Sequence, residues 1–212
     1  MKVQALLPLM AATVAIAPSP VSAAILIEDI ESAVAIPDNF SFKTELEADY
    51  SLVSQTGDLS SISVTAPARI NFYALGSESG LENTFLFGAL SHTEADYAYD
   101  PTRLIGSADF TSPGSFGGLV FMSDGGLPAV PGLSNFGIFL PVGFSGSSYL
   151  TDTLVFGYDD GGASDDDYDD FVILAQISPI PEAHTWALLV AGFGLVGWQM
   201  RRSRARGLST AG

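Results

Sequence analysis

Hydrophobic and polar residues alternate with a period of two in the middle of the chain. The clearest example is TELEADYSLVS (44–54), where Leu46, Ala48, Tyr50 and Leu52 alternate with acidic or hydroxyl residues. Because successive side chains of a β-strand point to opposite faces, this pattern predicts a strand with one face in a core.

Eight further short runs have the same character. They are SISVT, ARINFYA, TFLFGAL, LIGSADF, GGLVFM, FGIFLP, TLVFGY and FVILAQI. Each run is rich in β-branched or aromatic residues and is bounded by residues that favour turns. Helical periodicity is hardly visible between them. We therefore expect an all-β fold, an antiparallel, jelly-roll-like β-sandwich, in a single domain over residues 24–178.

The first residues have the order of a secretory signal peptide. One lysine precedes an apolar stretch that is too short to span a bilayer comfortably, and small residues follow. The alternative, a buried N-terminal helix, would be interrupted by Pro8, Pro18 and Pro20. We expect residues 1–23 to form a signal peptide that signal peptidase removes after Ala23.

A second hydrophobic segment lies near the other end. Residues 183–200 carry no formal charge and have a tryptophan near each edge, which is typical of a membrane span. The alternative, a core helix of a globular domain, is disfavoured because every face is apolar. The segment is followed by Arg201, Arg202, Arg204 and Arg206. Such a cluster stays cytoplasmic, so we expect a single C-terminal transmembrane helix with the domain exported across the inner membrane.

The whole tail, residues 179–206, resembles the PEP-CTERM sorting domain. Pro181 and Glu182 match the first two positions of its Pro-Glu-Pro motif, and Ala183 stands at the third. A Gly-containing hydrophobic helix and an arginine cluster follow, as in that family. The resemblance implies processing by an exosortase and delivery to the surface or matrix of a Gram-negative bacterium that makes exopolysaccharide. The helix would then lie in the membrane only before processing.

The charge of the middle region is almost purely acidic. Between Ala24 and Pro181 there are 23 aspartates and glutamates, against Lys43, Arg69 and Arg103. A surface of this kind repels nucleic acid and attracts divalent cations, so we expect no nucleic-acid partner. The chain has no cysteine, which excludes disulfides and thiolate metal sites.

The densest group of acids is GYDDGGASDDDYDDFVIL (157–174). We assign Asp159, Asp165, Asp167, Asp169 and Asp170 as candidate Ca²⁺ ligands, because Ca²⁺ takes six to eight oxygen ligands and relieves repulsion between carboxylates. In an extended chain, Asp165, Asp167 and Asp169 would share one side, opposite Asp166, Tyr168 and Asp170. The alternative is a solvated acidic turn at a sheet edge. Both interpretations remain open at this point.

This segment also resembles the C-terminal motif of the DUF4114 family. The resemblance rests on Asp167, Tyr168, Asp169, Asp170 and Phe171 and implies an extracellular location. An EF-hand does not fit, because counting from Asp165 gives Asp170 at position six and Gln176 at position twelve. Upstream, residues 122–134 contain two prolines and three glycines, which predicts a long exposed loop whose Asp124 could reach a cation.

Catalytic patterns are missing from the middle of the sequence. His92 is its only histidine, which we expect in a loop, and there is no Gly-x-Ser-x-Gly or P-loop motif. We therefore expect no enzyme, but a surface-sorted protein associated with extracellular polysaccharide or the biofilm matrix, with Ca²⁺ as its one candidate cofactor. One alternative is a glycan-acting enzyme with paired carboxylates. Another is an ice- or surface-adhesion module, although no regular Thr-rich repeat is present.

Overall fold

The fold is all-β, as the sequence predicts. The computed structural model describes residues 22–30, 33–53, 62–95, 97–144, 146–161, 167–179 and 183–207. The strands are β1 (Ile25–Glu28), β2 (Ala33–Val34), β3 (Tyr50–Val53), β4 (Ile62–Val64), β5 (Ala68–Gly76), β6 (Asn83–Phe87), β7 (Leu90–Thr93), β8 (Leu104–Phe110), β9 (Gly114–Ser115), β10 (Leu119–Ser123), β11 (Phe136–Pro141), β12 (Ser148–Thr151), β13 (Thr153–Tyr158) and β14 (Phe171–Pro179). Two helices, α1 (Lys43–Leu46) and α2 (Ala183–Gly207), complete the described elements.

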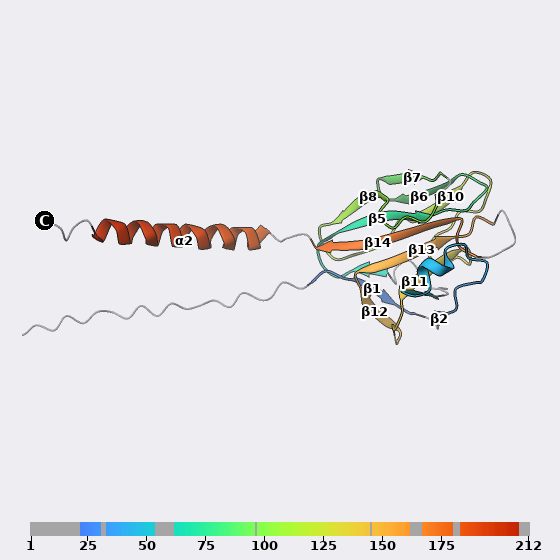
Figure 1. Cartoon of the computed structure of the whole chain (residues 1–212), viewed down its shortest axis with the longest axis horizontal. Helices are drawn as coiled ribbons and strands as arrows, with labels where there is room; N and C mark the ends of the chain where they lie inside the picture. The colour runs from blue at the N-terminus through green and yellow to red at the C-terminus, as the bar shows by residue number, and fades with distance from the viewer. Residues whose placement is uncertain are drawn as a thin grey trace, which may run out of the picture.

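The strands form three antiparallel sheets. The largest has seven strands in the order β2-β3-β11-β13-β14-β5-β8, and the others have the orders β12-β1-β4-β9 and β10-β6-β7. In Figure 1 the two smaller sheets lie on either side of the middle strands of the large one. Strand β14 is central, because β13 and β5 pair with it on its two edges.

One hydrophobic core joins the three sheets. Phe72 on β5, Phe85 on β6 and Phe121 on β10 are each fully buried. Phe72 and Phe85 have ring centroids 5.2 Å apart, and Phe121 stacks on Tyr158 of β13 at 5.1 Å. Burying each such side chain contributes about 1.5–3 kcal/mol. This shared core gives the molecule a sandwich-like character, whereas a jelly-roll order of strands stays a prediction.

The opposite face of the large sheet is also buried at its middle strands, β11 and β13. Phe40, Phe42 and Leu46 pack there against Phe139 and Val155, and Figure 1 shows α1 in front of β11 and β13. The strand predicted for residues 44–54 is therefore wrong in its first half. Leu46 closes α1 and covers the sheet, a turn of exposed residues follows, and only Tyr50–Val53 is a strand. Ala48, which the pattern placed on the buried face, is exposed in this turn.

The eight other predicted runs are confirmed as strands. They correspond to β4, β5, β6, β8, β10, β11, β13 and β14. His92, predicted in a loop, lies on β7 instead. Of the exposed loop predicted for residues 122–134, the first two belong to β10, and the connection that follows contains Ala129, which is fully buried and bridges to Phe121. Five strands were not predicted: β2 and β9, which have only two residues each, and the four-residue strands β1, β7 and β12.

The predicted C-terminal segment lies in α2, which begins at Ala183 and contains all four arginines of the cluster. Among the described residues, no helix is both long enough and apolar enough to cross a membrane. The signal peptide up to residue 21 and the sorting-motif residues Pro181 and Glu182 lie outside the described residues. Export, cleavage after Ala23 and the domain boundaries therefore stay predictions.

Strand β14 connects the two ends of the sandwich. It begins beside the Asp-rich segment and ends at Pro179, at the end where the N-terminal strand β1 also enters (Figure 1). At about 3.3 Å per residue, a strand of this length is roughly 30 Å long. The Asp-rich segment is therefore held at the end away from the predicted sorting tail.

Gly157 on β13 provides a test of how the chain before β14 packs on β13, because the backbone at Tyr168 passes directly over it. A Cβ at this position would lie 2.6 Å from the carbonyl oxygen of Tyr168 and 2.8 Å from the Phe139 ring. We expect Gly157→Ala to destabilise the protein by about 1–3 kcal/mol through overpacking, measured as a lower melting temperature. Gly80→Ala, where no atom lies within 4 Å of the added Cβ, is the matched control and should melt as the wild type does.

Candidate functional site

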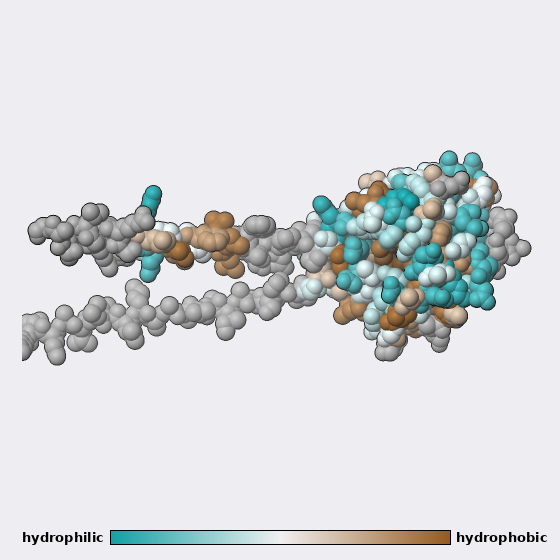
Figure 2. All heavy atoms as spheres, viewed as in Figure 1, coloured by the Kyte–Doolittle hydropathy of each residue, from teal (hydrophilic) through white to brown (hydrophobic). Residues whose placement is uncertain are grey.

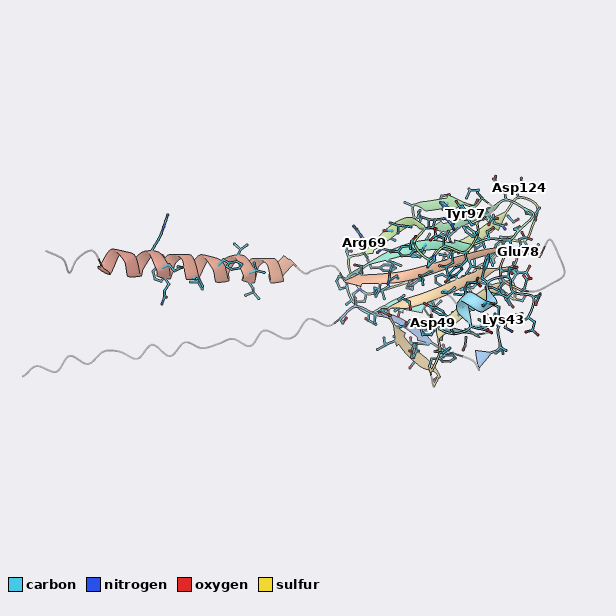
Figure 3. The ribbon with its side chains drawn as sticks, in the orientation of Figure 1. Lys43, Asp49, Arg69, Glu78, Tyr97 and Asp124 are labelled. Atoms are coloured by element: carbon cyan, nitrogen blue, oxygen red, sulfur yellow. The ribbon has the colours of Figure 1, made fainter. Side chains whose placement is uncertain are left out.

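The aspartates lie at one end of the sandwich, where the chain passes from β13 to β14. Asp159 and Asp160 directly follow β13, and Asp167, Asp169 and Asp170 directly precede β14. Because β13 and β14 are antiparallel neighbours, the end of one adjoins the start of the other. Figure 2 shows a hydrophilic surface along this end, and in Figure 3 the acidic residues Glu78 and Asp124 lie there too. We call this region the acidic end.

Four of these aspartates are buried rather than solvated. Asp159, Asp160, Asp167 and Asp169 are only 4%, 2%, 5% and 1% exposed. A solvated acidic turn therefore does not describe them. Burying a carboxylate costs free energy unless hydrogen bonds or opposite charges compensate for the lost hydration.

The basic residues of the middle region are engaged with other acids. Their ion pairs are Lys43–Asp38 at 2.6 Å, Arg69–Asp109 at 2.7 Å and Arg103–Asp100 at 3.6 Å. Figure 3 shows Arg69 at the opposite end of the sandwich from Glu78 and Asp124. Compensation for the buried aspartates has to come from hydrogen-bond donors, protons or cations.

Asp167 and Asp169 form one side of the acidic end. Their side chains are hydrogen-bonded to each other, and the backbone N–H of Ser41 donates to Asp169 Oδ2. Asn39 Nδ2 donates to Asp167 Oδ2 at 3.2 Å. Burial raises the pKa of Asp169, while the bonds from Ser41 and Asp167 act against this shift. Two carboxyl groups this close repel each other when both are ionised, and a shared proton or a bound cation would relieve that repulsion.

The other side is a network in which Asp160 is central. Its backbone N–H donates to Asp170 Oδ2 at 2.6 Å. Its Oδ2 accepts from Ser79 Oγ at 2.5 Å and from Asn83 Nδ2 at 3.2 Å. The backbone N–H of Asn83 in turn donates to Glu94 Oε1 at 2.9 Å. Asp170, Asp160, Asn83 and Glu94 are thus connected step by step.

Two acids of this network have strongly raised pKa values. Burial raises the pKa of Asp170 to about 7, and the negative charges of Asp160, Asp159 and Asp169 add to the shift. Burial likewise raises the pKa of Glu94 to about 7, against hydrogen bonds from Ser77 and Asn83 that lower it. Without a cation, both groups are therefore partly protonated near neutral pH.

A hollow of about 230 Å³ opens beside Glu94. It is lined by Ser79, Gly80, Leu81, Glu82, Glu94 and Ala95. The sequence analysis did not identify Ser79, Asn83 and Glu94. They lie on or beside the β6–β7 hairpin, far from the Asp-rich segment along the chain. Each is an isolated polar residue, so no local motif marks it.

The predicted calcium ligands are only partly brought together. Asp167 and Asp169 share one side as expected, Asp170 turns to Asp160, and Asp165 lies outside the described residues. Asp159 accepts a bond from the Gly161 N–H at 2.7 Å. Over the described part of the chain, no three His, Asp or Glu side chains converge in a metal-binding group.

Two other residues from the sequence analysis, Tyr168 and His92, make packing and hydrogen-bond contacts within the sandwich. Tyr168 has a positive φ of 67° and packs against Gly137 and Gly157, so it does not lie beside Asp170 as strict alternation required. His92 is within hydrogen-bonding distance of Tyr97 Oη at 3.3 Å, and burial together with the charge of Arg103 lowers its pKa.

The comparisons with known proteins find no matching family model, no similar curated protein and no similar solved structure. The chemistry of the acidic end therefore carries the functional argument.

The raised pKa values predict an unusual pH dependence in Ca²⁺-free buffer. Between about pH 4 and pH 7, folded Asp170 and Glu94 retain protons that they have lost in the unfolded chain. Their contribution to stability is full below that window and falls as the pH rises through it. We expect the melting temperature to fall over this range, and Glu94→Gln with Asp170→Asn to flatten the fall. An equally steep fall in the double variant would contradict this assignment.

Proposed function

We propose that this chain is an exported, surface-sorted, non-catalytic protein of a Gram-negative bacterium. It associates with the extracellular polysaccharide or biofilm matrix, and Ca²⁺ orders its Asp-rich segment. The observation that carries the calcium part is the set of buried aspartates at the acidic end, while Lys43, Arg69 and Arg103 each pair with another acid. Ca²⁺ takes oxygen ligands of this kind.

Sorting of the protein rests on the two ends of the sequence. Signal peptidase would cut after Ala23, and an exosortase would act at Pro181 and Glu182. Before that step, residues 183–200 would lie in the membrane with the arginine cluster in the cytoplasm. Removal of the tail would leave a matrix protein without a membrane segment.

The calcium part of the proposal fits one side of the acidic end best. Asp167 and Asp169 are in contact, and Glu78 is close enough for its charge to raise the pKa of Asp169. Glu78 also accepts a bond from Ser41 Oγ at 2.8 Å, so it is held beside the same backbone. A cation here would replace a shared proton and remove the repulsion between the carboxylates.

Mass spectrometry of surface protein tests the sorting step. In an exosortase-containing Gram-negative host, we expect the mature chain to begin at Ala24 and to lack the hydrophobic helix, because both processing enzymes have acted. In a strain without the exosortase, and in a Pro181→Ala/Glu182→Ala variant, the tail should remain and the protein should stay with the membrane fraction. Surface protein that still ends at Gly212 in the exosortase-containing host would rule out a removable tail.

Calorimetry tests calcium binding by the Asp-rich segment. We expect the full-length chain in detergent to bind Ca²⁺ and to melt at a higher temperature when it is bound. Changing Asp165, Asp167 and Asp169 together to Asn should remove one bound Ca²⁺ per chain, because the carboxylate ligands are lost. Asp109→Asn is the control, since Asp109 pairs with Arg69 elsewhere. An unchanged stoichiometry in the triple variant would refute this site.

A further inference from the structure

Two buried oxygen atoms beside the hollow lack hydrogen-bond partners. They are Asn83 Oδ1, in a residue that is 0% exposed, and Glu94 Oε2. When Glu94 is ionised, both atoms are acceptors and neither can satisfy the other, whereas a protonated Glu94 could donate from Oε2. A buried acceptor without a donor or cation costs free energy, and these two lie in residues that are hydrogen-bonded to each other.

The neighbouring bonds fix both orientations. The Asn83 amide cannot be turned over, because its Nδ2 donates to Asp160 Oδ2 at 3.2 Å and a flip would place Oδ1 against that carboxylate. Glu94 is held because its Oε1 accepts the backbone N–H of Asn83. Asn83 therefore holds both oxygens in place. Its side-chain amide bonds Asp160, and its backbone N–H bonds Glu94.

The charge around these oxygens is negative throughout. The network adds the carboxyl groups of Asp160 and Asp170, and Glu82 contributes another on the rim of the hollow. The basic residues Lys43, Arg69 and Arg103 pair with acids outside this network. A bound water molecule could donate to both oxygens but would leave this charge uncompensated, whereas a divalent cation would coordinate both oxygens and balance the charge.

We propose a Ca²⁺ site formed by Asn83 Oδ1 and Glu94 Oε2, with the carboxylates of Asp160 and Asp170 balancing its charge and the hollow as its entrance. Because Asn83 supplies an amide oxygen, Glu94 would be the one carboxylate in direct contact with the ion. Ca²⁺ accepts amide oxygens, carboxylates and water in variable geometry, while Mg²⁺ demands a strict octahedron.

This site is separate from the one proposed at Asp167 and Asp169. Those residues are bonded to Asn39 and Ser41, which precede α1, whereas Asn83 and Glu94 belong to the β6–β7 hairpin. The inference does not depend on export or sorting, because it rests only on the described residues of the sandwich.

Glu94→Gln provides the sharpest test, because it keeps an acceptor for the Asn83 N–H and removes the charge. Calcium titration of the full-length chain in detergent should show one site at least tenfold weaker in this variant. The variant with Asn at 165, 167 and 169 should keep that site. Mg²⁺ at equal concentration should bind it at least tenfold more weakly than Ca²⁺ does. Asp109→Asn serves again as the unaffected control.

Melting curves separate a ligand from a merely structural residue. In Ca²⁺-free buffer, Glu94→Gln should melt at the same or a higher temperature than the wild type, because one buried carboxyl group is gone. In saturating Ca²⁺ the wild type should melt at a higher temperature than Glu94→Gln. Unchanged calcium affinity in Glu94→Gln, with only the Ca²⁺-free melting temperature altered, would show that a water molecule occupies the position and would overturn the proposal.

Discussion

The middle strands of the large sheet, β11 and β13, are buried on both faces, and this constraint governs the rest of the molecule. The inner face of the sheet joins the core shared by the three sheets, and its outer face is covered there by Phe40, Phe42 and Leu46. Strands in such a sheet have to be apolar almost throughout, as β11, β13 and the first half of β14 are. Charged residues are consequently displaced to the strand ends.

The acidic end is the clearest result of that displacement. Pairing of β13 with β14 brings acids before and after the connection together, and tight packing leaves four of them almost without solvent. Since the sandwich supplies few positive charges, hydrogen bonds from Ser79, Asn83 and the backbone carry much of the compensation. These bonds do not fully replace the lost hydration, and burial therefore raises the pKa values of Asp170 and Glu94.

The sequence predicts the strands well because each buried run is locally apolar and bounded by turn residues. It fails at residues 44–49, where burial of Leu46 under a short helix imitates the spacing of a strand. It locates the Asp-rich segment but not its partners. Asn83 lies 77 positions and Ser79 lies 81 positions from Asp160, so only the order of strands in the sheets brings them together. That order depends on long-range packing, which no local pattern records.

The position of β14 has a mechanical consequence. This strand leads to the tail and is hydrogen-bonded on both edges, to β13 from Val172 to Gln176 and to β5 from Val172 to Pro179. Inter-strand hydrogen bonds run perpendicular to the strands, so a pull on the tail along β14 loads many of them at once in shear. A strand at the edge of a sheet, pulled sideways, would lose them one at a time. The chain therefore leaves the sandwich through a strand that is paired on both edges, which would resist a pull along its length.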